Sequence, residues 1–247
     1  MRRALVALVL LALAPAPARA QPPIVRPPDG ASMPADQLGA QLFAGNCATC
    51  HGSRGTGVPR RGPSLKRAGA AAADFYLRTG AMPLGQPEEQ PARQRVRLAE
   101  REIRALTDYV ASLGSGPAVP TPQPERGSLA EGMQLFAQHC AGCHQIVGEG
   151  GVVTGARVPS LDRATDVQIA EAVRTGPYVM PRFGPRAISD AQLDSIIRYV
   201  DYAQRPDDRG GWGISHLGPF PEGIVAWLLA GGLLVGTCVL IGERARR

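Results

Sequence analysis

The chain of 247 residues carries 27 lysines and arginines against 21 aspartates and glutamates, which gives a formal net charge of +6. Without the three arginines of the first 20 residues and the three arginines and one glutamate of the last five, 21 basic and 20 acidic residues remain. With a central part so close to neutral, nothing in the charge balance argues for binding to nucleic acid.

Residues 1–20 have the three-part layout of a cleavable export signal. Arg2 and Arg3 precede an apolar run at residues 4–14, and Ala18-Arg19-Ala20 follows it. The run is too short to span a bilayer. We therefore expect residues 1–20 to be removed and the chain after them to lie outside the cytoplasm.

Two short motifs share the pattern C-x-x-C-H, at residues 47–51 and 140–144. In this pattern both thiols add across vinyl groups of a haem, and the histidine binds the iron. Zinc ribbons and thioredoxin-like sites also use C-x-x-C, but they do not require the histidine, and these two pairs lie about 90 residues apart, too far for a zinc ribbon. The sequence thus predicts two covalently attached haem c groups, with thioether cysteines and proximal histidines at Cys47, Cys50, His51, Cys140, Cys143 and His144.

The segment between residues 29 and 208 is an internal repeat. Four short sequences recur in the same order, namely QLFA at 41–44 and 134–137, PSL at 63–65 and 159–161, RTG at 78–80 and 174–176, and MP at 82–83 and 180–181. We expect two tandem all-α domains at residues 29–114 and 125–208. A proline-rich linker at residues 115–124 should let them swing relative to each other.

Helix signals bracket the second copy. Ser128 with Glu131, and Ser189 with Gln192, have the spacing of capping boxes that open helices. The last helix of each copy should present one apolar face, formed by Ile103, Leu106, Val110 and Leu113 in the first and by Leu193, Ile196, Ile197 and Val200 in the second.

Residues 223–242 contain no charged side chain, and 20 such residues make about 30 Å of helix, enough to cross a bilayer once. Three arginines lie in the tail at residues 243–247, which places that tail on the cytoplasmic side. Residues 209–222 would be a juxtamembrane loop. We expect a single-pass protein of the cell membrane whose two repeated domains lie on the extracytoplasmic side.

Each copy resembles a class I cytochrome c, in which the first and last helices cross beside the haem. On the first helix, a glycine and an aromatic residue match that family, and an aromatic residue on the last helix matches it too: Gly39, Phe43 and Tyr109, then Gly132, Phe136 and Tyr199. A glycine lets two helix backbones approach closely. Ordinary core aromatics would explain the residue types but not the same offsets twice.

The resemblance also implies the remaining haem contacts. Met82 and Met180 follow an Arg-Thr-Gly sequence and precede a proline, as the distal methionine does in this family, although a loop methionine is more often core filler. The carbonyls of Pro63 and Pro159 would accept a hydrogen bond from the proximal histidines. Histidine and methionine ligation predicts electron transfer rather than substrate activation. Two arginines, Arg78 and Arg174, either pair with haem propionates or mark helix ends followed by glycine.

The order of parts resembles the dihaem cytochrome c subunit of actinobacterial cytochrome bc complexes, which are menaquinol–cytochrome c reductases. This resemblance implies that electrons come from a Rieske iron–sulfur centre and pass to a cytochrome c oxidase, with the quinol site on other subunits, among them cytochrome b. From the chain geometry we expect the second domain to face the Rieske centre and the first to reach the oxidase. The alternatives are a free-standing membrane-anchored dihaem electron donor and a dihaem redox enzyme such as a peroxidase.

Overall fold

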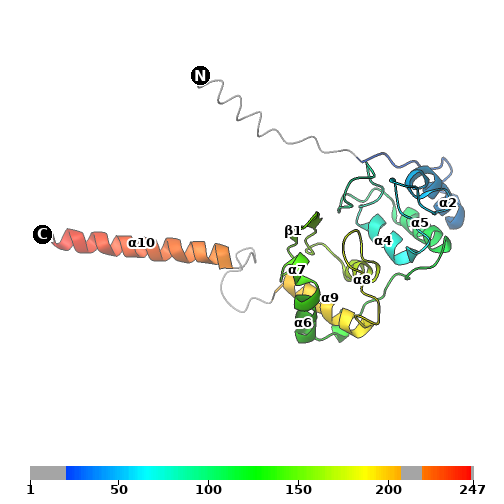
Figure 1. The fold of residues 1–247 in the computed structure, drawn as a ribbon. Coiled ribbons are helices and arrows are strands. Elements are labelled where there is room, and N and C mark those ends of the chain that lie inside the picture. Colours follow the sequence, from blue (N-terminus) through cyan, green and yellow to red (C-terminus); the bar gives the residue numbers. More distant parts are fainter. Residues whose placement is uncertain (1–20, 207–218, 246–247) are drawn as a thin grey trace, which may run out of the picture. The chain divides into compact units, whose positions relative to one another are not determined.

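The computed structural model describes residues 21–206 and 219–245. It divides into one compact unit that ends at Arg205 and a second that begins at Pro206. The first unit contains both repeated domains, and the second contains a single described helix (Figure 1). The expected export signal and most of the expected juxtamembrane loop lie outside the described residues.

The first domain consists of four helices, α2 (Ala35–Asn46), α3 (Ala48–His51), α4 (Gly69–Arg78) and α5 (Glu100–Ser112). Helix α5 packs against both α2 and α4. Spacings of three and four residues place the apolar side chains of α5 on one face, as expected. The core includes Leu38, Leu42, Phe43, Leu77, Ile103, Leu106 and Val110.

The second domain repeats this plan. It contains η1 (Pro124–Arg126), α6 (Leu129–His139), α7 (Ala141–His144), β1 (Gly151–Val153), β2 (Ala156–Val158), α8 (Asp166–Thr175) and α9 (Asp190–Gln204). Helix α6 packs on α9 as α2 packs on α5. The antiparallel hairpin of β1 and β2 is an addition that the sequence analysis did not predict.

A close crossing of the first and last helices is present in both domains. A Cβ atom built on Gly39 would overlap the backbone carbonyl of Ala105, and one on Gly132 would overlap that of Ser195. Beside these crossings the rings of Phe43 and Tyr109 lie 5.0 Å apart between centroids, and the equivalent rings of the second domain, Phe136 and Tyr199, lie 5.2 Å apart. The mostly helical fold and the repetition of one plan in two domains are therefore confirmed.

One of the two expected capping boxes forms completely. The Ser189 hydroxyl accepts from the Gln192 backbone N–H, and the Gln192 side chain accepts from the Ser189 N–H. Ser128 accepts from the Glu131 N–H, but the Glu131 carboxylate accepts from the hydroxyl of Ser195 on α9 instead of reaching back. This side chain thus joins α6 to α9.

The two domains pack against each other through α4 and α8. The linker, which we expected to let the domains swing, is hydrogen-bonded to both of them in this structure. The Ser115 N–H donates to the Lys66 carbonyl at 2.9 Å, and the Gln123 N–H donates to the Asp194 carboxylate at 2.8 Å.

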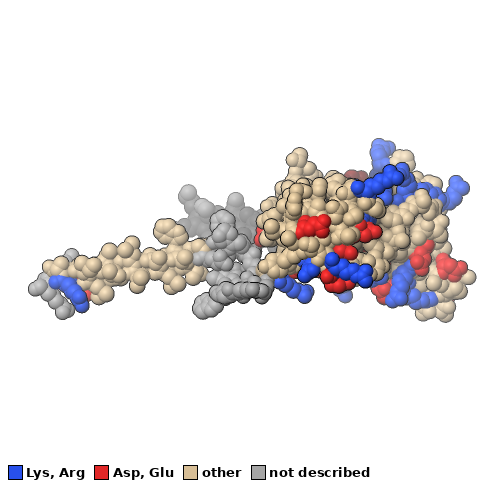
Figure 2. All heavy atoms as spheres, turned by 90° about the horizontal axis from the view of Figure 1, so that it is seen from below, with Lys and Arg blue, Asp and Glu red and all other residues tan. Residues whose placement is uncertain are grey.

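The second unit is helix α10 (Pro219–Ala245). Within its stretch Gly223–Ala245, an 18-residue window has a mean hydropathy of 2.4, and the length and composition of the stretch make it a possible membrane anchor. Figure 2 shows charged side chains at one end of the described helix, and the sequence has Glu243 and Arg244 in its last turn. The predicted tail therefore begins inside the helix rather than after it.

Candidate haem sites

Each C-x-x-C-H motif folds as one helical turn. The His51 N–H donates to the Cys47 carbonyl at 2.9 Å, and the His144 N–H donates to the Cys140 carbonyl at the same distance. In such a turn, residues three apart lie on the same face. The two cysteines of each motif, Cys47 with Cys50 and Cys140 with Cys143, are therefore placed to meet one edge of a planar group.

The four motif cysteines are free thiols. Burial, with a smaller contribution from the second cysteine of each motif, raises the pKa of Cys47 to about 12 and that of Cys140 to about 11. These thiols are therefore neutral at physiological pH. Two cysteines on one face, followed directly by a histidine, suit covalent attachment to a haem.

The proximal histidines differ between the two domains. The Nδ1 atom of His51 lies 2.8 Å from the Pro63 carbonyl oxygen, so its N–H can donate there and leave Nε2 for a metal. The Nδ1 atom of His144 is buried and has no hydrogen-bond partner of good geometry among the described residues. Burial lowers the pKa of His144, and the nearby Pro159 carbonyl opposes part of this effect. Both donor sets fit a haem.

The two methionines lie in the loops that follow α4 and α8, and both are half-buried. The Met82 N–H donates to the Tyr76 carbonyl at 3.2 Å, and the Met180 N–H donates to the Pro177 carbonyl at 3.0 Å. Met180 also packs against the core of the second domain. These contacts fix the loops but do not join a methionine to its histidine, so iron ligation by Met82 and Met180 stays a prediction.

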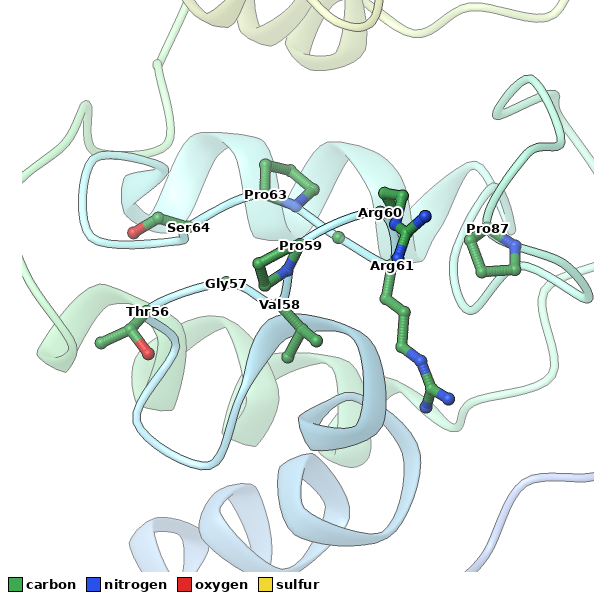
Figure 3. A pocket seen from close by; sticks show the side chains of 10 residues that line it. Thr56, Gly57, Val58, Pro59, Arg60, Arg61, Pro63, Ser64 and Pro87 are labelled. Carbon is green, nitrogen blue, oxygen red and sulfur yellow. The ribbon is translucent and has the colours of Figure 1, made fainter.

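A hollow of about 570 Å³ adjoins the first motif. Figure 3 shows that it lies between the loop that contains Pro63 and a second loop that contributes Pro87. Its lining includes Arg60 and Arg61 but not the motif cysteines or His51, so the hollow borders the motif and does not enclose it. The sequence analysis did not single out these two arginines, which follow the motif closely and could pair with carboxylates.

Arg78 and Arg174 mark helix ends and form ion pairs within the chain. Arg78 pairs with Asp74 at 2.7 Å and with both oxygens of Glu100, and hydrogen bonds from Arg78 and Arg104 lower the pKa of Glu100 to about 2. The following glycine, Gly80, has a φ of +66°.

In the second domain, Arg174 is buried. It donates to the carbonyls of Phe183 and Ile188 and pairs with Asp190 at 2.6 Å. The residue that caps the end of α8, Gly176, has the left-handed conformation. Of the two readings that the sequence left open, the structure thus favours the helix end, and Arg174 holds the loop beyond Met180.

The interface between the domains contains a buried acid pair. Glu171 of α8 is completely buried, and neither of its carboxyl oxygens meets a donor among the described residues, because the neighbouring group is the carboxyl group of Asp74. Burial, and then the charge of Asp74, raise the pKa of Glu171 to about 9, although Arg78 opposes the shift. This raised pKa favours the neutral form of Glu171 at pH 7.

Comparison with known proteins gives matches over both domains. The family model described as "Cytochrome c" matches residues 37–114, and the one described as "Cytochrome C oxidase, cbb3-type, subunit III" matches residues 127–200. The cytochrome bc1 complex cytochrome c subunit of Corynebacterium diphtheriae is 35% identical over 227 residues, which cover 85% of this chain and 81% of that protein.

Two further relatives bear on the choice of family. The cytochrome bc1 complex cytochrome c subunit of Mycobacterium tuberculosis is 37% identical over 218 residues, covering 85% of this chain and 78% of that protein. The cbb3-type cytochrome c oxidase subunit CcoP of Azospirillum sp. is 29% identical over 194 residues, covering 66% of this chain and 60% of that protein.

Proposed function

The chain belongs to the family of cytochrome bc1 complex cytochrome c subunits, and from this we propose that it is the dihaem electron-transfer subunit of a menaquinol–cytochrome c reductase. Its two cytochrome c domains bind haem c and support electron transfer. The observation that carries the proposal is the repeated one-turn C-x-x-C-H helix, which occurs in both domains of a chain similar to these relatives over 85% of its length.

We assign one haem c to each domain. Cys47 and Cys50 would hold the first, and Cys140 and Cys143 the second. When bound, each haem iron exchanges one electron between its ferric and ferrous states. The proximal ligands would be His51 and His144, oriented by the carbonyls of Pro63 and Pro159, and the distal ligands would be Met82 and Met180.

The proposed role of the protein residues is to keep each site closed. Two protein ligands per iron leave no position for a substrate, and loops held by hydrogen bonds keep the ligands in place in both oxidation states. The hydrogen bond between His51 and Pro63 supports this role, because it fixes the ring plane and directs Nε2 away from its own loop.

We propose that the partners are the cytochrome b and Rieske iron–sulfur subunits, which would supply the electron, and a cytochrome c oxidase, which would receive it. The quinol site would lie on other subunits, so this chain would contribute to the enzyme as its electron carrier. Helix α10 would anchor the chain in the cell membrane, with the haem domains outside and the end at Arg247 inside.

Two alternatives make different predictions. A dihaem redox enzyme would need one iron without a firm sixth ligand, and its reduced form would bind carbon monoxide. A free-standing electron donor would purify alone. Similarity at 35–37% identity to relatives named as subunits of the cytochrome bc1 complex supports the complex over both alternatives.

The test is purification of the chain from its own membranes in a mild detergent, with mass spectrometry of all proteins that remain bound. We expect cytochrome b and Rieske subunits to accompany it, and two haem groups to add to the mass of the chain. Replacing Cys47 and Cys50 by alanine should remove one haem, whereas Cys238→Ala, on α10, should remove none. Isolation of the chain without these subunits would contradict the proposal.

A further inference from the structure

The two loops that carry the predicted distal methionines meet at a single residue, Tyr76. Its hydroxyl oxygen accepts a hydrogen bond of 3.1 Å from the backbone N–H of Tyr178, in the other domain. Its backbone carbonyl accepts the N–H of Met82 in its own domain. Tyr76, near the end of α4, therefore accepts hydrogen bonds from the backbone of both methionine-containing loops.

The loop of the second domain that contains Tyr178 has little conformational freedom. Tyr178 has a φ of +55°, a left-handed conformation that residues with a Cβ atom rarely adopt without support from their surroundings. On the preceding turn, a Cβ atom on Gly176 would lie 2.8 Å from the carbonyl oxygen of Met180. Because Tyr178 and Met180 share this tight turn, a change at the Tyr178 N–H would be passed to Met180.

The hydroxyl of Tyr76 is itself well placed and neutral. Its ring packs edge-on against Phe75, with 5.4 Å between ring centroids. Burial raises the pKa of Tyr76. Further contacts hold the same interface together, since the Gln90 side chain accepts from the Arg157 N–H, and Arg93 donates to Gln168 at 2.6 Å.

We propose that Tyr76 is a positioning residue that holds the Met180 loop against the first domain and so stabilises methionine ligation of the second haem. The inference rests on the proposed function, which takes Met82 and Met180 as the distal ligands. Tyr76 would act through the backbone of Tyr178 and would not touch the iron.

The test uses the full-length, haem-loaded protein in detergent and titrates the oxidised form with imidazole. Imidazole binds a ferric haem only after the methionine has left, so its apparent affinity rises with the fraction of methionine-free haem. The weak near-infrared absorption of the sulfur–iron bond reports each replacement. Loss of one hydrogen bond of ordinary strength raises that fraction about fivefold.

The titration should have two phases, one for each haem. We expect Tyr76→Phe to shift one phase to an imidazole concentration about fivefold lower and to leave the other phase in place. Met180→Ala identifies the affected phase, because this variant should lack it. Tyr202→Phe, an exposed tyrosine on α9, is the matched control and should change neither phase. Glycine adopts a positive φ without strain, so adding Tyr178→Gly to Tyr76→Phe should reduce the shift to less than twofold.

Unchanged phases in Tyr76→Phe, an equal shift of both phases, or a shift that Tyr178→Gly leaves undiminished would overturn the inference while the ligand assignment stands. If Met180→Ala keeps the near-infrared absorption of both haems, the assignment of Met180 itself fails, and the role of Tyr76 falls with it.

Discussion

Replacing the buried Glu171 by glutamine should make the protein more stable above neutral pH. Glu171 is completely buried between α8 and α4 against the carboxyl group of Asp74, and Arg78 is the cation that opposes this repulsion. A glutamine side chain has nearly the same shape, stays neutral at every pH and can donate a hydrogen bond to Asp74.

The size of the effect follows from proton linkage. The pKa of Glu171 is about 9 in the folded protein, against an ordinary value of 4.5. Between these two values the folded state holds one more proton on Glu171 than the unfolded state does. The stability that this group contributes is therefore fully present below pH 4.5 and is lost as the pH rises towards 9. The slope is about 1.4 kcal/mol per pH unit, and the loss at pH 7 amounts to about 3 kcal/mol.

The assay is thermal unfolding of the haem-loaded, full-length protein between pH 6.5 and 8.5. This range avoids Asp201, whose pKa of about 6 is raised by burial and by Asp166. We expect the unfolding temperature of the unmodified protein to fall by roughly 3–5 °C per pH unit, while that of Glu171→Gln stays level over the same range. Glu125→Gln, an exposed residue in η1, should follow the unmodified protein. Parallel pH profiles for Glu171→Gln and the unmodified protein would refute a protonated Glu171.

Three further changes test other parts of the structure. Met82→Ala should abolish the near-infrared sulfur–iron absorption of one haem and let that haem bind carbon monoxide when reduced; persistence of both absorptions would show that another residue is the ligand. Gly132→Ala should lower the free energy of unfolding, measured by urea titration, by about 2–3 kcal/mol because its methyl group overlaps the Ser195 carbonyl. Gly184→Ala is the control and should have little effect, because no atom lies within 4 Å of its new methyl group. Asp201→Asn should remove a loss of stability that the unmodified protein shows as the pH rises from 4 to 6, which thermal unfolding over that range would detect.

The sequence predicted those parts of the fold in which the chemistry requires a particular residue type or a particular spacing between neighbouring residues. A haem thioether pair needs its spacing of two residues, and a close helix crossing needs a glycine, so both could be recognised at Cys47, Cys50 and Gly39. Their recurrence in the second copy supplied an independent check. The hairpin of β1 and β2 could not be found in this way, because strands of three residues are too short to show alternation.

The interface between the domains was missed for a different reason. Asp74 and Glu171 lie in separate helices, and a charged residue within a helical pattern normally indicates the solvent-exposed face. Only the packing of α4 on α8 turns Glu171 into a buried group. The proline-rich composition of residues 115–124 indicated a free spacer, because sequence composition does not reveal hydrogen bonds such as that between Ser115 and Lys66.

Packed domains change what is expected of electron exchange between the two proposed haems. Domains that swing would sample many separations, and the internal transfer would then follow a spread of rates. The hydrogen bond between Tyr76 and Tyr178, together with the contact of Asp74 and Glu171, holds one arrangement. We therefore expect internal electron transfer to follow a single exponential when an added photoreductant, excited by a light pulse, donates one electron to the oxidised protein. Because ionised Glu171 would repel Asp74, a second, slower phase should appear as the pH rises above 9; a spread of rates already at pH 7 would show that the domains separate in solution.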